Sequence, residues 1–130
     1  MDAVYGSAFI LNHNSSLVRQ GESSLIAGRF YVKEGVSMEG MRPEYFEAIP
    51  AICRCFGLHG SPAVLTSGLD GEHMEKSLHY DGLAGDWRIW HVTKERREEL
   101  AALLRFMLGP SWDVVLEETH IHIERQLRIR

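Results

Sequence analysis

The feature that most restricts the fold of this chain is a two-residue alternation near the end of the printed sequence, His120-Ile121-His122-Ile123. Successive side chains of a β-strand point to opposite faces, so the two histidines share one face and the two isoleucines share the other. The isoleucine side is expected to pack on a core. The pattern therefore predicts a strand over Thr119–Leu127 whose other face carries imidazoles.

Apolar and β-branched runs elsewhere predict further strands, each bounded by Gly, Pro or polar residues. A hairpin around Glu118 is expected to join the last two strands of the chain. The strands predicted in addition to Thr119–Leu127 are Ser24–Val32, Ala63–Ser67, Ala84–Trp90 and Trp112–Glu117.

Two helices are expected between these strands. The first covers Glu44–Phe56 after a proline that a first helical turn tolerates, and Gly57 is its expected end. Pro50 is expected to kink or split this helix. The second helix begins after Thr93, a favourable N-cap residue, and continues to Leu108. Its predicted core-facing residues are Leu100, Leu103, Leu104 and Met107.

The mixed order of strands and helices indicates an α+β protein. There are too few β-α-β alternations for a doubly wound sheet, so we expect a small, mostly antiparallel sheet with flanking helices. With 130 residues, the chain is expected to form a single domain over 1–130, with residues 1–24 extended or loop-rich.

Composition excludes some classes of partner. The net charge of −4 provides no general basic surface for nucleic acid. No apolar run approaches the roughly 18 residues of a membrane span, and no signal peptide is recognisable. Cys53 and Cys55 lie two apart in a predicted helix, so their side chains point to different sides. Free buried thiols are therefore expected, rather than a disulfide or a metal-binding pair.

A second informative segment, around residues 79–86, combines possible metal ligands with small residues. His79 and Asp86 have six residues between them, and Gly82 and Gly85 allow the chain to turn tightly near an ion. The preceding polar stretch, Gly68–Gly82, is expected to be a loop. Histidines and a carboxylate suit a zinc ion that keeps one position for water.

These two segments together carry a family resemblance. The pattern H-x-x-G-x-A-x-D at 79–86, followed by H-x-H at 120–122, resembles zinc D-Ala-D-Ala carboxypeptidases and L-alanyl-D-glutamate peptidases, which cut peptidoglycan stem peptides. The signalling domain of hedgehog proteins is a relative of these enzymes. The resemblance covers about Val64–Glu124 and is greatest to small phage-encoded members, so a hedgehog-like peptidase fold is expected.

The resemblance implies specific roles for five histidine and aspartate residues. His79, Asp86 and His122 would be the zinc ligands. His120 would stand beside the metal-bound water, where it stabilises the oxyanion or moves a proton. His73 matches a further active-site histidine of the hedgehog branch.

The general base is less directly matched. Several relatives carry an acid three residues before the last zinc histidine, where this chain has Thr119, which cannot serve as a base. Glu117 is the first candidate, and Glu118 is the alternative.

Substrate preference also departs from many carboxypeptidase relatives. They carry an Arg after a Ser-Gly pair, where it grips a terminal carboxylate, whereas Ser67-Gly68 is followed here by Leu69. An endopeptidase, or a carboxylate contact from Arg42 or Arg88, is therefore favoured.

The resulting hypothesis is a zinc-dependent peptidase of the carboxypeptidase or endopeptidase type, encoded by a phage or prophage and acting on peptidoglycan stem peptides. It would be cytoplasmic until released by a holin, or virion-associated with other virion proteins as partners. The alternative, motivated by Thr119, is a non-catalytic zinc-binding hedgehog-like module or a virion structural component.

Overall fold

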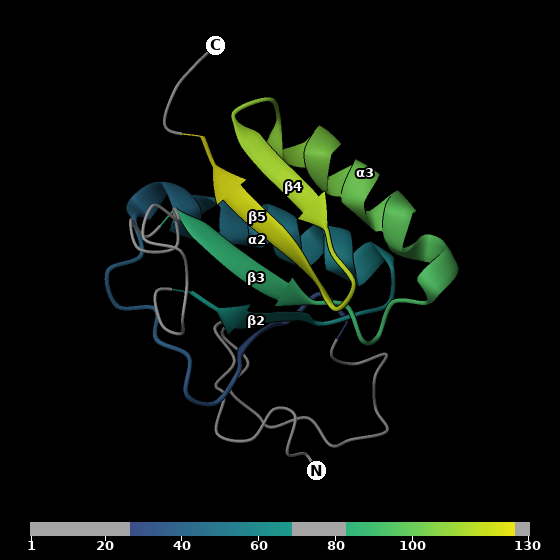
Figure 1. Cartoon of the computed structure of the whole chain (residues 1–130), viewed down its shortest axis with the longest axis horizontal. Coiled ribbons are helices and arrows are strands. Elements are labelled where there is room, and N and C mark those ends of the chain that lie inside the picture. Colours follow the sequence, from purple (N-terminus) through teal and green to yellow (C-terminus); the bar gives the residue numbers. More distant parts are fainter. Residues whose placement is uncertain (1–26, 69–82, 127–130) are drawn as a thin grey trace.

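A five-stranded sheet and two α-helices make up the part of the chain described by the structure, a computed structural model in which residues 27–68 and 83–126 are described. Strand predictions for Ser24–Ile26 and the expected loop at 69–82 fall outside this range. The elements in chain order (Figure 1) are β1 (Phe30–Val32), α2 (Pro43–Leu58), β2 (Ala63–Ser67), β3 (Ala84–Arg88), the 3-10 turn η1 (Lys94–Arg96), α3 (Arg97–Leu108), β4 (Trp112–Leu116) and β5 (His120–Arg125).

The sheet has the strand order β1-β2-β3-β5-β4. β1 pairs with β2 in parallel, whereas β2–β3, β3–β5 and β4–β5 are antiparallel. The prediction of an α+β protein with a mostly antiparallel sheet is therefore confirmed. β5, the strand with alternating histidines and isoleucines, lies between β3 and β4, so residues of both neighbours flank its side chains.

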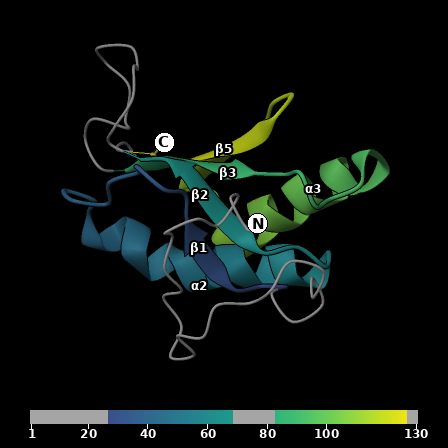
Figure 2. The ribbon, with the colours of Figure 1, turned by 90° about the horizontal axis from the view of Figure 1, so that it is seen from below.

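Both helices pack on the same face of the sheet (Figures 1 and 2). The side chains that point toward them include Trp87, Ile121 and Ile123, each 0% exposed. His120 and His122 point to the opposite face, which no helix in the described ranges covers. The predicted division of β5 into a core side and a histidine side is thus confirmed.

Tyr45 of α2 links the helical layer to the two central strands. Its hydroxyl donates to the carbonyl oxygen of Ile123 at 2.9 Å and accepts a hydrogen bond from Trp87 Nε1 at 3.0 Å. Burial raises the pKa of this phenol, so the hydroxyl keeps its proton and remains a donor. Tyr45 therefore ties the backbone of β5 to the side chain of β3.

Helix α2 differs from the prediction at Pro50 and at Gly57. It runs through Pro50 without being split, because Pro50 is exposed while Ile49 and Ile52 on either side of it are buried in the core. It also runs past Gly57 to Leu58. A Cβ atom at Gly57 would lie 2.9 Å from Gly28 Cα, so glycine is required there by close approach of the chain and not by a helix end.

The remaining boundaries were predicted less accurately. β1 begins only at Phe30, because Gly28 has a φ of 80° that interrupts an extended strand. β3 ends at Arg88, and Trp90 lies in a turn with 58% exposure. The prediction of Trp90 as the last strand residue was therefore wrong.

The second predicted helix is confirmed only in part. The turn η1 precedes α3, and Thr93 makes no side-chain capping hydrogen bond. Leu100, Ala101 and Leu104 form the buried face, whereas Met107 is 38% exposed and was wrongly assigned to the core. Within residues 27–68 and 83–126, no helix has both the length and the apolar character needed to cross a membrane.

The two cysteines of α2 are free, as predicted. Cys55 is buried and Cys53 is half-buried. Burial raises the pKa of the Cys53 thiol to about 12 and that of Cys55 to about 11. Both thiols therefore stay protonated at neutral pH and are poor metal ligands.

We expect Gly85→Ala to destabilise the protein by about 1–3 kcal/mol, the usual cost of overpacking a core. An added Cβ would lie 2.8 Å from both Leu65 Cδ1 and the Tyr45 hydroxyl oxygen, neither of which can move without disturbing the core. Urea unfolding followed by circular dichroism measures the loss. An unchanged midpoint would show that Leu65 and Tyr45 have room to shift.

Candidate functional site

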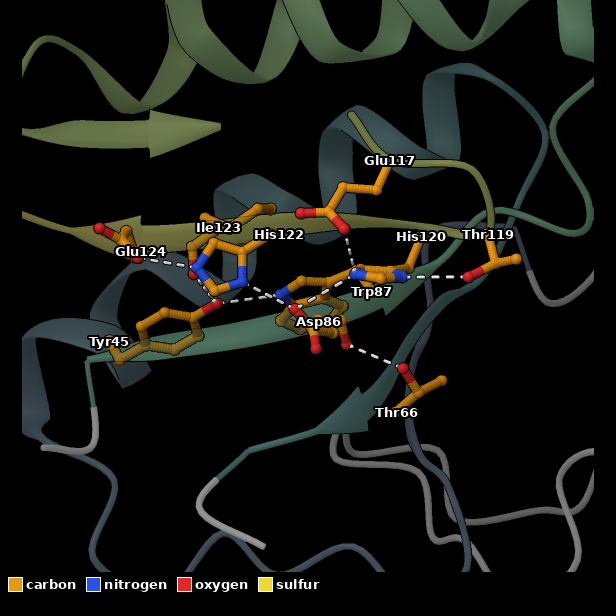
Figure 3. A network of polar contacts seen from close by, with 10 residues as sticks. All are labelled: Tyr45, Thr66, Asp86, Trp87, Glu117, Thr119, His120, His122, Ile123 and Glu124. Atoms are coloured by element: carbon orange, nitrogen blue, oxygen red, sulfur yellow. Dashed lines mark hydrogen bonds and ion pairs between the residues drawn. The ribbon is translucent and has the colours of Figure 1, made fainter. Parts of the chain in front are cut away.

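Pairing between β3 and β5 brings three of the predicted site residues, Asp86, His120 and His122, together on the sheet face that is turned away from the helices (Figure 3). The register places Asp86 beside His122 and Arg88 beside His120. Paired residues of an antiparallel sheet share a face, so the carboxylate and both imidazoles project to the same side. Residues 36 apart in the sequence thereby form one polar cluster.

His122 is held between two carboxylates. Its Nδ1 lies 2.8 Å from Asp86 Oδ1, and its Nε2 lies 2.7 Å from Glu124 Oε1. The three side chains are 18%, 15% and 23% exposed, respectively, so they are largely shielded from water. Figure 3 shows the ring between the Glu124 and Asp86 carboxylates.

This environment raises the pKa of His122 from 6.5 to about 9. The hydrogen bond to Asp86 is the largest cause, burial opposes it, and Glu124 adds to it. Without a metal, the ring is therefore protonated at neutral pH, and each nitrogen donates to one carboxylate. A metal ion at Nδ1 would have to displace that proton, so metal binding at this ring releases a proton.

The second imidazole, His120, lies on the far side of Asp86 from Glu124 (Figure 3). Its Nε2 is 3.7 Å from Asp86 Oδ1 and 3.5 Å from Glu117 Oε1, and its Nδ1 is 3.1 Å from Thr119 Oγ1. Because the carboxylates adjoin Nε2, a proton is favoured on that nitrogen, and the Thr119 hydroxyl donates to Nδ1. Thr119 thus orients a ring that faces both carboxylates.

A pocket of about 270 Å³ adjoins His120. The guanidinium carbon of Arg88 stacks 3.9 Å above the centre of the Trp90 ring at its wall. The pocket therefore offers a cation, hydroxyls and an aromatic face beside the imidazole. Its lining residues are Thr66, Arg88, Trp90, Thr119 and His120.

The other candidate residues are distributed as follows. Glu117 lies directly after β4 with its carboxylate toward His120, whereas Glu118 is exposed in the hairpin turn. Arg42 precedes α2 and pairs with Glu44 at 4.0 Å, so of the two candidate arginines only Arg88 lines the pocket. His73 and His79 lie outside the described residues.

Sequence reasoning missed Glu124. It lies two residues after His122 on β5, so the same alternation that groups the histidines also places Glu124 on their face. Extending the pattern by one step would have identified it as a possible hydrogen-bond partner of His122.

The donor set of the described residues suits part of a zinc site. Asp86 Oδ1 and His122 Nδ1 are the atom types that zinc binds, and their 2.8 Å separation is shorter than the roughly 3.4 Å expected between two ligands of one tetrahedral zinc. A small rotation of either side chain would open this separation. No group of three His, Cys, Asp or Glu side chains within 27–68 and 83–126 is arranged to hold a metal, and the third predicted ligand, His79, lies outside those ranges.

The comparisons with known proteins give no relative. No protein-family model matches the chain, and no curated protein or solved structure matches it. The family resemblance therefore remains a prediction from the two motifs.

In metal-free protein, we expect the His122 ring to titrate with a midpoint near 9. A folded-state pKa raised from 6.5 stabilises the fold fully below pH 6.5, and this contribution is lost as the pH rises through about 9. NMR titration of the histidine rings after chelation measures the midpoint.

His59 provides an internal control, because burial and the nearby Arg96 lower its pKa. A His122 midpoint at or below that of His59 would contradict the two-carboxylate geometry.

Proposed function

We propose that this protein is a zinc-dependent peptidase that hydrolyses bonds in peptidoglycan stem peptides. The observation that carries the proposal is the Asp86–His122 pair at 2.8 Å, with the His120 imidazole and the Glu117 carboxylate beside it. A structural zinc site is closed by protein ligands, whereas this cluster adjoins a pocket.

The residues that would hold zinc are Asp86, His122 and His79. Bound zinc would lower the pKa of a water molecule to about 7 and polarise the scissile carbonyl. Asp86 and His122 are fixed by strand pairing on neighbouring strands, which provides two ligands on rigid elements.

Glu117 is proposed as the general base. It would take the proton of the attacking water and later pass it to the leaving amine, so the two transfers balance within one turnover. Its carboxylate is 48% exposed, which leaves it accessible to water and substrate, and it lies 3.5 Å from His120 Nε2. The Nε2–H group of His120 would donate a hydrogen bond to the developing oxyanion and keep its proton throughout.

The pocket beside His120 suggests how the substrate is held. Stem peptides carry carboxylates, and Arg88 in the pocket wall supplies a fixed cation for one of them. This arrangement is compatible with either a D-Ala-D-Ala carboxypeptidase or an endopeptidase. A phage or prophage origin, with release by a holin or carriage in a virion, is part of the same proposal and rests on the motif resemblance.

Zinc-loaded protein is expected to release peptide fragments from purified peptidoglycan, as measured by chromatography and mass spectrometry. Glu117→Gln should keep stoichiometric zinc but lose about 10²- to 10⁴-fold in rate, the usual contribution of a general base. The fragment masses would identify the cleaved bond.

The Glu118→Gln variant decides between the two candidate bases. Whichever variant loses activity while keeping zinc identifies the base. If fully zinc-loaded protein releases no fragments, the enzyme proposal fails.

The alternative is a non-catalytic zinc-binding module or virion component. It is favoured by Thr119, which hydrogen-bonds His120 at the position where relatives carry an acid.

His122→Ala should abolish stoichiometric zinc binding, because it removes one of the three proposed ligands. Metal analysis after dialysis against zinc measures the content, and circular dichroism checks that the fold persists. The exposed His91, which lies in the turn after β3, provides the matched His→Ala control. Retention of stoichiometric zinc by His122→Ala would show that this ligand assignment is wrong.

A further inference from the structure

We propose that Glu124 is a positioning residue that holds the His122 imidazole by Nε2 and thereby presents Nδ1 to the metal. This inference rests on the zinc site proposed above. It assigns a role to a carboxylate that the two sequence motifs do not include.

The contact itself is close and well shielded. Glu124 Oε1 lies 2.7 Å from His122 Nε2, and its side chain is only 23% exposed. A ring with a metal at Nδ1 retains its proton at Nε2, and a carboxylate at hydrogen-bond distance is the strongest acceptor for that proton. Glu124 therefore favours the one neutral form of His122 that can bind a metal on the Asp86 side.

The second carboxylate oxygen of Glu124, Oε2, also accepts a hydrogen bond. The Gln126 side-chain amide nitrogen donates to Glu124 Oε2 at 3.2 Å and also donates to Asp113 Oδ2. Asp113 is paired with Glu124 across β4 and β5, so two carboxylates of like charge lie opposite each other. The shared amide donor offsets their repulsion and fixes the direction of the Glu124 carboxylate.

The residue on the other neighbouring strand is small. Ala84 pairs with Glu124 across β3 and β5. Its side chain is a single methyl group on the same face of the sheet as Glu124. The β4–β5 hairpin and the residue after it thus contain His122, its carboxylate partner Glu124, and Gln126, which fixes that carboxylate.

The test compares zinc affinity, measured by competition with a chromophoric chelator, in the unaltered protein and three variants. Glu124→Ala should weaken zinc binding by about 10- to 100-fold, the usual effect of removing the carboxylate partner of a ligating histidine. Glu124→Gln keeps an oxygen acceptor for Nε2–H and should lose less. Glu98→Ala, which removes an exposed carboxylate from α3, is the matched control and should bind as the unaltered protein does.

NMR of the His122 ring nitrogens provides a readout that a purely structural role would not change. In zinc-loaded protein, Nε2 should carry a hydrogen-bonded proton, and Glu124→Gln should keep this proton while shifting its resonance. Equal zinc affinity in the unaltered protein, Glu124→Ala and Glu98→Ala would overturn the positioning role alone. Absence of zinc binding by the unaltered protein would instead overturn the proposed function and this role with it. If Glu124→Ala fails to fold, zinc affinity is compared between Glu124→Gln and Glu98→Gln instead. Weaker binding by Glu124→Gln alone supports the positioning role, and equal affinity overturns it.

Discussion

The pairing of β3 with β5 is the interaction on which the rest of this molecule depends. It sets Asp86 beside His122 and at the same time sends Trp87, Ile121 and Ile123 to the helices. A slip of one residue would turn every side chain of β5 to the other face. The imidazoles would then enter the core and the isoleucines would meet water, so the hydrophobic effect and the polar site select the same register.

Tyr45 couples this register to helix α2 through two hydrogen bonds. Its hydroxyl accepts from the Trp87 indole and donates to the Ile123 carbonyl, so both bonds form only when β3 and β5 are aligned as observed. Leaving either buried group without its partner would carry a desolvation cost. The core side of the sheet therefore holds the strands whose other side carries the proposed chemistry.

The parts of this fold that follow from local periodicity were predictable from sequence. The alternation at His120–Ile123 predicted a two-faced strand, and Ala63–Ser67 was predicted to its exact limits. Features that depend on tertiary contact were not. The glycine at 57 was taken as a helix end, whereas it is needed because another segment passes within van der Waals distance, which no local pattern reveals.

The same division applies to the site. The motifs brought Asp86, His120 and His122 together in the prediction, and strand parity explains why the structure does so too. The orientation of Glu117 toward His120 depends on the geometry of the β4–β5 hairpin, which sequence spacing alone did not define. The contact of Glu124 with His122, in contrast, follows from the same strand alternation that groups the histidines.

The one-sided covering of the sheet by α2 and α3 has an evolutionary consequence. Because the side chains that stabilise the fold and those that form the polar cluster occupy opposite faces of the same strands, each set can change while the other is kept. A lineage could exchange residues such as Thr119 at the hairpin, and with them its reactivity, without losing a folded domain. Inheritance of this architecture is therefore separable from inheritance of its chemistry.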